Sequence, residues 1–198
     1  MAKRQSLFQK LQDSARRREI PLRTAESRKW FSRKARRVKT TRRQILTDPL
    51  VRRTQPGMLF PGRMYTYVYD PKHKETLPFY DRFPLILMVG PAKDGWYGLN
   101  LHYLAPAARA RFLDKIIETR NNNQFDETTQ ARISYGMLSG ASRFKEFQPT
   151  FKHYLGGYVR SQIAEIMMSE WEIAIFLPTE SFQKQSKFKV WGHSRRSY

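Results

Sequence analysis

Lysine and arginine gather in short runs along the first 55 residues, which hold 18 basic and four acidic residues. This segment has a net charge of +14, out of +20 for the whole chain of 198 residues. Arginine, whose planar guanidinium can bind two phosphate oxygens at once, outnumbers lysine here. The clustered residues are Arg16, Arg17, Arg18, Arg28, Lys29, Arg33, Lys34, Arg36, Arg37, Arg42, Arg43, Arg52 and Arg53. Their chemistry is the binding of a polyanion or of an acidic protein surface.

Nucleic acid is the favoured partner, because each phosphate that a Lys or Arg neutralises releases condensed counterions. The sequence has no zinc-finger spacing, no basic region followed by heptads and no RNA-recognition aromatic motif. We therefore expect contact with the backbone of duplex DNA, without sequence reading. Membrane contact is not expected, because the longest apolar run, 84–89, is far too short to cross a bilayer. No apolar run follows Met1–Arg4, so no secretory signal is expected either.

Residues for catalysis or metal binding are few. The chain has no Cys, and it lacks the common phosphate-loop, dinucleotide, zinc-protease and hydrolase motifs. Glu170 and Glu172 would share one face of a strand, but they have no companion carboxylates for a two-metal site. The four histidines, which are His73, His102, His153 and His193, show no ligand spacing. We expect no metal, no cofactor and no enzymatic activity.

One set of polar residues keeps an enzymatic alternative open, that of a small-barrel nuclease. Asp81 and Arg82 precede an apolar run, and His102 follows the next expected strand. A base and an acid could come from such a set. A turn-stabilising role is favoured for Asp81 and Arg82, and a structural hydrogen bond for His102.

Two helices are expected to position the basic residues. Residues 6–19 have apolar residues at helical spacing behind Ser6, a candidate N-cap, and Pro21 interrupts the pattern. A second helix is expected over 24–38, with Trp30 and Phe31 as docking anchors, either on the body of the protein or on a neighbouring subunit. Turn residues at 47–57 mark the boundary of an Arg-rich arm, residues 1–56.

The next block reads as β structure. Residues 64–69 alternate strictly, with Tyr65, Tyr67 and Tyr69 on one face. Residues 85–89 are apolar on both faces, as in a central strand, and a turn at Asp94–Gly95 leads to a third strand over 96–101. An SH3-like barrel is the first choice, and an open, bent antiparallel sheet is the alternative. The three tyrosines could face the core, a partner or nucleic acid.

The second half is expected to supply supporting helices and a closing strand. Helices are predicted from Pro106, over 126–138 and over 158–168, and a strand over 171–177 that returns to the sheet. The body then spans 57–182 and a basic tail spans 183–198. The tail is expected to become ordered only on assembly.

Several stretches resemble structural proteins of T4-like contractile-tailed phages, in particular the group of DNA end protectors and head-completion proteins. They are Tyr69–Lys72, Leu77–Leu85, Gly95–Leu104 and the closing Trp171–Pro178, and the resemblance covers residues 57–180. It implies a virion protein, made in the host cytoplasm, that contacts the end of packaged DNA near the neck. It implies no catalytic site.

Together these observations predict an α+β domain preceded by an extended basic arm. We expect a non-enzymatic phage virion protein that binds DNA, other head, neck or tail subunits, or both, within an oligomeric ring or assembly. The alternative is a tail or baseplate subunit whose basic arm wraps an acidic neighbour without touching DNA.

Overall fold

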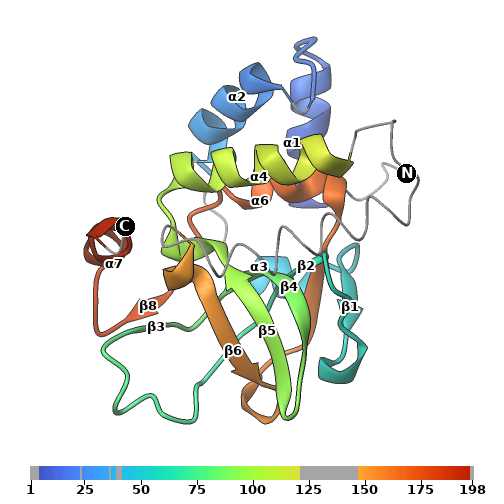
Figure 1. The fold of residues 1–198 in the computed structure, drawn as a ribbon. Helices are drawn as coiled ribbons and strands as arrows, with labels where there is room; N and C mark the ends of the chain where they lie inside the picture. Colours follow the sequence, from blue (N-terminus) through green and yellow to red (C-terminus); the bar gives the residue numbers. More distant parts are fainter. Residues whose placement is uncertain (1–4, 23, 36, 39–41, 121–146, 197–198) are drawn as a thin grey trace.

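A computed structural model describes residues 5–22, 24–35, 37–38, 42–120 and 147–196. The chain forms an antiparallel sheet below a layer of helices (Figure 1), so the predicted α+β class is confirmed. The helices are α1 (Leu7–Arg16), α2 (Ala25–Ala35), α3 (Arg42–Thr47), α4 (Pro106–Arg120), α6 (Trp171–Ala174) and α7 (Lys187–Arg196). The strands are β1 (Arg52–Thr54), β2 (Met64–Thr66), β3 (Tyr80–Asp81), β4 (Leu85–Ala92), β5 (Gly95–Asn100), β6 (Phe151–Leu155), β7 (Ile163–Ile166) and β8 (Phe182–Gln183). Short 3-10 turns lie at Pro56–Met58, Leu101–Tyr103, Gln148–Thr150, Gly156–Tyr158 and Met168–Glu170.

The main sheet is open. Its order is β1-β7-β2-β4-β5-β6, all neighbouring pairs are antiparallel, and β3 pairs with β8 in a separate ribbon. The edge strands β1 and β6 do not pair with each other, so the SH3-like barrel is wrong and the open sheet is found instead. Strands β1 and β2 have only three residues each, and helices rather than barrel closure cover the apolar face. A β-bulge between Met88 and Gly90 interrupts the β4–β5 register.

Strand β4 is central and buried on both faces, as predicted. Leu85, Leu87 and Val89 belong to the core cluster that the helices cover, while Ile86 and Met88 belong to a second cluster on the other face. Because successive side chains of a strand point to opposite faces, β4 joins the two cores.

The basic N-terminal segment forms the two predicted helices, and these pack on the sheet rather than standing apart as an extended arm. Ser6 caps α1 as predicted: its hydroxyl accepts a hydrogen bond from the Gln9 amide at 3.1 Å. Phe8 of α1, and Trp30 and Phe31 of α2, are buried in the same core cluster as β4. The two anchors thus pack on the body of the protein itself. Burying them offsets the cost of ordering a segment rich in positive charge.

Two elements of the second half differ from the prediction. The helix expected over 158–168 is a 3-10 turn followed by β7, which pairs with both β1 and β2. The strand expected over 171–177 begins instead with α6, where Trp171 donates its indole N–H to the Ile166 carbonyl at 3.0 Å. The helix expected over 126–138 lies outside the described residues.

The C-terminal tail forms α7, which docks on the body. Val190 is buried, and Trp191 donates its indole N–H to the His102 carbonyl at 2.8 Å. Of the helices that the structure describes, none is long and apolar enough to cross a membrane.

Candidate nucleic-acid interface

Some of the predicted basic residues turn inward and bind protein groups. Arg28 lies 2.8 Å from Asp114 and 3.6 Å from the buried carboxylate of Glu172. Arg42 donates to the backbone carbonyls of Thr179 and Glu180 at 2.9 and 2.5 Å. These contacts tie α2 and α3 to α4 and the C-terminal part of the chain, so Arg28 and Arg42 support the fold.

Arg52 and Arg53 also contact groups of the protein itself. Arg52 reaches Glu165 of the neighbouring strand at 3.4 Å, and Arg53 donates to the carbonyls of Leu46 and Asp48 at 3.4 and 3.2 Å. Their side chains remain exposed, and an exposed ion pair stabilises a fold by at most about 1 kcal/mol.

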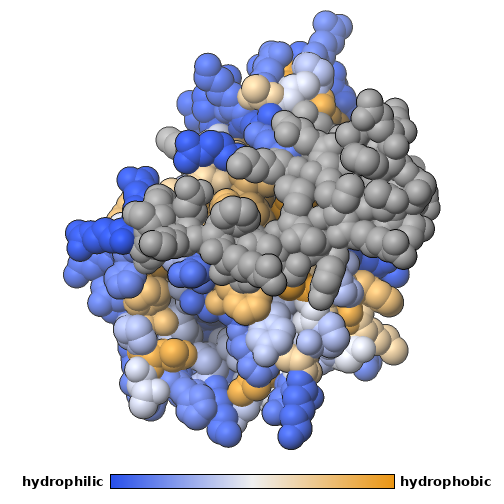
Figure 2. Space-filling view, in the orientation of Figure 1, coloured by the Kyte–Doolittle hydropathy of each residue, from blue (hydrophilic) through white to orange (hydrophobic). Residues whose placement is uncertain are grey.

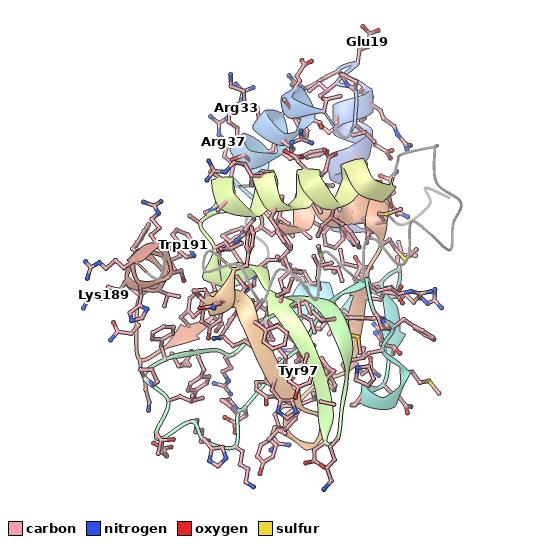
Figure 3. All side chains as sticks on the ribbon, viewed as in Figure 1. Glu19, Arg33, Arg37, Tyr97, Lys189 and Trp191 are labelled. Atoms are coloured by element: carbon pink, nitrogen blue, oxygen red, sulfur yellow. The ribbon has the colours of Figure 1, made fainter. Side chains whose placement is uncertain are left out.

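A stripe of basic residues along α2 and the turn that follows it faces solvent. Lys29, Arg33 and Arg37 are spaced four residues apart, all three are exposed, and none has an ion-pair partner among the described residues. Residues four apart share one side of a helix, so Lys29 and Arg33 lie on one side of α2, and Arg37 follows in the turn after Ala35. The buried residues of the helix include Trp30, Phe31 and Ala35. In Figure 3, Arg33 and Arg37 point outward on the same side of the molecule as Lys189 of α7. We call Lys29, Arg33, Arg37 and Lys189 the outer basic face.

The distribution of hydrophilic residues on the surface agrees with the position of the outer basic face. Figure 2 shows hydrophilic residues gathered over α2 and along the side where α7 lies. Lys189, Arg195 and Arg196 of α7 are exposed, although the sequence analysis assigned them only to a basic tail. The signal for them was present in the sequence as a charged C-terminal run, but nothing in it showed that this run lies on the same side of the molecule as α2.

The other basic residues predicted to bind an anion differ in their contacts within the protein. Arg16 pairs loosely with Asp13 at 3.7 Å, Arg17 donates to the Asp13 carbonyl, and Arg18 is exposed. Lys34 lies over the Trp30 ring at 5.6 Å. Arg36 lies outside the described residues.

A cleft beside α3 brings together three arginines from distant segments. Arg42 and Arg43 line it with Arg82, which the sequence analysis had placed in a nuclease set, and with Ser161 and Ser181. The cleft holds about 540 Å³. Its described lining contains no acid, so it is chemically suited to an anion.

The other two nuclease candidates are buried in what we call the charge network: Asp81, His102, Arg109 and Glu180. Asp81 lies 2.7 Å from Nδ1 of His102 and also accepts hydrogen bonds from the Phe83 and Ser181 amides at 3.0 Å. Both side chains are at most 1% exposed. Arg82 is exposed at the cleft, so the three residues form no accessible catalytic set.

Arg109 is the residue of this network that the sequence analysis missed. Its guanidinium is fully buried, lies 2.6 Å from Glu180 and donates to the carbonyls of Leu104, Ile175 and His102. In the sequence it looks like one more cation on an amphipathic helix, so no local signal marked it.

The pKa values of the two carboxylates reflect their partners. Burial would raise the pKa of Asp81, but the neighbouring His102 and the amide hydrogen bonds hold it below its usual value. Burial likewise opposes ionisation of Glu180, and Arg109 overcomes this and lowers its pKa. Both groups are therefore charged at neutral pH and hold their neighbours in place.

The three tyrosines face the core rather than nucleic acid. Tyr65, Tyr67 and Tyr69 are at most 6% exposed and form the second cluster with Trp96 and Tyr154. Burial raises the pKa of the Tyr67 hydroxyl well above its usual value. These rings stabilise the sheet and cannot serve as a stacking platform for bases.

The suggested acidic pair does not form a metal site. Glu170 accepts a hydrogen bond from the Met167 amide at 3.0 Å, whereas Glu172 is buried against Ser27 and Arg28. Across the described ranges, no group of three or more His, Asp or Glu side chains is arranged to hold a metal ion.

Comparison with known families decides the affiliation. The family model of the phage T4 terminal DNA protecting protein matches residues 3–194. The chain belongs to this family. Comparisons with curated proteins and with solved structures found no match.

The family match confirms the resemblance to T4-like DNA end protectors and extends it. The resemblance rested on residues 57–180, whereas the match includes α1, α2, α3 and most of α7. The match thus includes both the basic helices and the sheet, and the family is that of a phage DNA-protecting protein. The outer basic face belongs to the matched region.

Proposed function

We propose that this member of the phage T4 terminal DNA protecting protein family binds the end of linear duplex DNA through its phosphate backbone, as a non-enzymatic component of the virion. The outer basic face carries this proposal. Its cations are exposed and have no ion-pair partner in the part of the chain that the structure describes, whereas Arg28 and Arg42 are used within the fold. A stripe of unpaired Lys and Arg is stabilised by phosphate and otherwise only repels itself.

Other virion proteins are the second class of partner in this proposal, within the head or neck assembly. Exposed apolar side chains fit protein contact better than DNA contact, and Phe188 of α7 is 71% exposed beside basic residues. The particle would then hold the protein on its DNA end through α7 and neighbouring surfaces.

A salt series tests DNA binding directly. The affinity of the purified protein should be measured for linear duplex and for closed circular duplex of the same sequence. If roughly 6 to 10 phosphates are contacted, the affinity falls by about 10³ to 10⁵-fold between 50 and 200 mM salt. Tighter binding of the linear form, on top of that slope, is the result expected for end binding.

Two different results would contradict end binding and DNA binding, respectively. A steep salt slope with equal affinity for both forms would contradict end binding and leave a general DNA-binding surface. Weak binding to both forms at every salt concentration would contradict the proposal, and would favour a tail or baseplate subunit that uses its basic helices on an acidic neighbour.

A further inference from the structure

A second concave site lies away from α2, between the β2–β3 connection and β6. It holds about 390 Å³, within the range of pockets that bind small molecules. Its walls are mostly apolar and aromatic, with cations at several points. Its lining includes Leu77, Phe79, Asp81, Tyr103, Lys152 and His153.

Lys152 is the unusual member of this pocket. It is half-buried on β6, its ammonium lies 4.3 Å from the centre of the Tyr103 ring, and within the described chain no carboxylate pairs with it. Burial lowers the pKa of Lys152 to about 8. A lysine is costly to desolvate in this way unless an anion completes its surroundings.

The pocket has no free negative charge to supply that anion. Asp81 is the one acid among its described lining residues, and its carboxylate is occupied by His102, Asn100 and the amides of Phe83 and Ser181. Lys72, His73 and His153 add donors along the wall. The site therefore has cationic character and apolar walls, which is the combination that a nucleotide requires.

Ring contacts connect the pocket with α7. The centre of the Phe79 ring lies 5.9 Å from that of Tyr103 inside the pocket, and 5.9 Å from that of His193 of α7. In Figure 1, α2, α7 and the β2–β3 connection follow one another down the same side of the molecule. A strand whose backbone crosses the outer basic face is thus led by α7 toward this pocket.

We propose that the pocket binds the terminal nucleotide of a DNA strand, with the base against Leu77 and Phe79 and the terminal phosphate on Lys152. A pocket of this size admits one nucleotide and excludes a duplex. Only a strand end supplies an unpaired nucleotide at low cost, because its base has one stacking neighbour. The inference rests on the proposed function and adds to it the group by which an end differs from internal DNA.

The test compares wild type with Lys152→Gln and with a matched control, Lys93→Gln, which removes one exposed lysine from the β4–β5 turn. Three short duplexes of one sequence serve as probes: with phosphorylated ends, with hydroxyl ends, and with both ends closed by hairpins. Wild type and Lys93→Gln should prefer the phosphorylated ends. Lys152→Gln should lose at least about tenfold of that preference, the effect of one charge-assisted contact, and keep its affinity for the hairpin-closed duplex.

A measurement on the wild-type protein guards against a folding defect in the variant. A deoxynucleoside monophosphate should compete with the phosphorylated ends and leave binding of the hairpin-closed duplex unchanged. Unchanged end preference in Lys152→Gln, or a monophosphate that does not compete, would overturn the pocket while DNA binding stands. Absence of binding to all three duplexes would overturn the proposed function, and the pocket with it.

Discussion

The charge network beneath α4 and the outer basic face of α2 and α7 both contain cations, but their surroundings differ completely. Arg109 is fully buried, with four protein acceptors for its N–H groups. Arg33 and Arg37 are exposed, with no ion-pair partner among the described residues. A buried cation that loses its partner is heavily destabilising, whereas an exposed one costs the fold almost nothing. The same residue type therefore holds the protein together in one region and is available for a ligand in the other.

The largest effect is expected from Arg109→Met, which keeps the volume but leaves Glu180 buried without its main cation. We expect the free energy of unfolding to fall by about 3–5 kcal/mol, measured by urea denaturation. Arg111→Met is the matched control, because Arg111 lies two residues further along α4 and is exposed. It should change stability by no more than about 0.5 kcal/mol. Similar losses in both variants would contradict the division into buried and exposed cations.

The second-largest effect is expected on DNA affinity, with no change in the free energy of unfolding. Replacing Lys29, Arg33 and Arg37 with Gln should lower the slope of log affinity against log salt by roughly 2.7, since each phosphate contact contributes about 0.9. The control replaces Lys93, Arg111 and Arg160, which are exposed and carry the same total charge. An equal drop in both triple variants would show that affinity follows net charge, and that the stripe on α2 has no special role.

Acid should act on the charge network and leave the outer basic face unaffected. Asp81 and Glu180 have pKa values below their usual 3.8 and 4.5, so the stability that they contribute is present above those values. As the pH falls below 3.8 and 4.5, the two carboxylates of the unfolded chain take up protons before those of the folded protein. The stabilising contribution of Asp81 and Glu180 is therefore lost progressively, until the pH has passed their lower pKa values in the folded state. The urea midpoint should therefore drop steeply below about pH 4.5. Glu180→Gln should flatten that dependence, and a midpoint curve identical to wild type would count against this role.

The sequence predicted the division between a basic segment and an apolar body, but not how individual cations are used. Neighbours on a helix point about 100° apart, so Arg28 turns toward Glu172 while Lys29 turns to solvent. Which of the two faces inward depends on where Trp30 and Phe31 pack, and the sequence leaves their docking site open. Arg109 is harder still, since its partner Glu180 is 71 residues away.

Elements whose pattern is unambiguous were predicted well. Residues 85–89 of β4 are apolar on both faces, and Ser6 as the N-cap gives the start of α1 a local signature. The errors at β7 and α6 arose where short apolar runs fit two structures. Ile163 and Ile166 are three residues apart, as on a helix face, but β7 gains backbone hydrogen bonds from strands on both sides. Such pairing is non-local, so periodicity cannot show it.

The smallest effect is expected at Glu19, where two substitutions distinguish backbone strain from charge repulsion. Glu19, just after α1, has a φ of 54°, in the left-handed region where glycine is favoured, and the Ile20 amide closes the helix end on the Ala15 carbonyl at 3.1 Å. Glu19→Gly removes both this strain and a negative charge next to Arg16–Arg18. It should stabilise the protein by about 0.5–1 kcal/mol in thermal or urea unfolding.

Glu19→Gln removes the charge and keeps the strained backbone, so it is the matched control. It should leave stability within about 0.5 kcal/mol of wild type. If DNA approaches the end of α1, both variants should bind it slightly more tightly at low salt, because an acid has left a basic surface. A gain in stability for Gln equal to that for Gly would show that charge repulsion, and not the left-handed backbone, limits stability there. A gain in DNA affinity for Gly alone would tie binding to the geometry of the helix end, and would extend the interface from the stripe on α2 to α1.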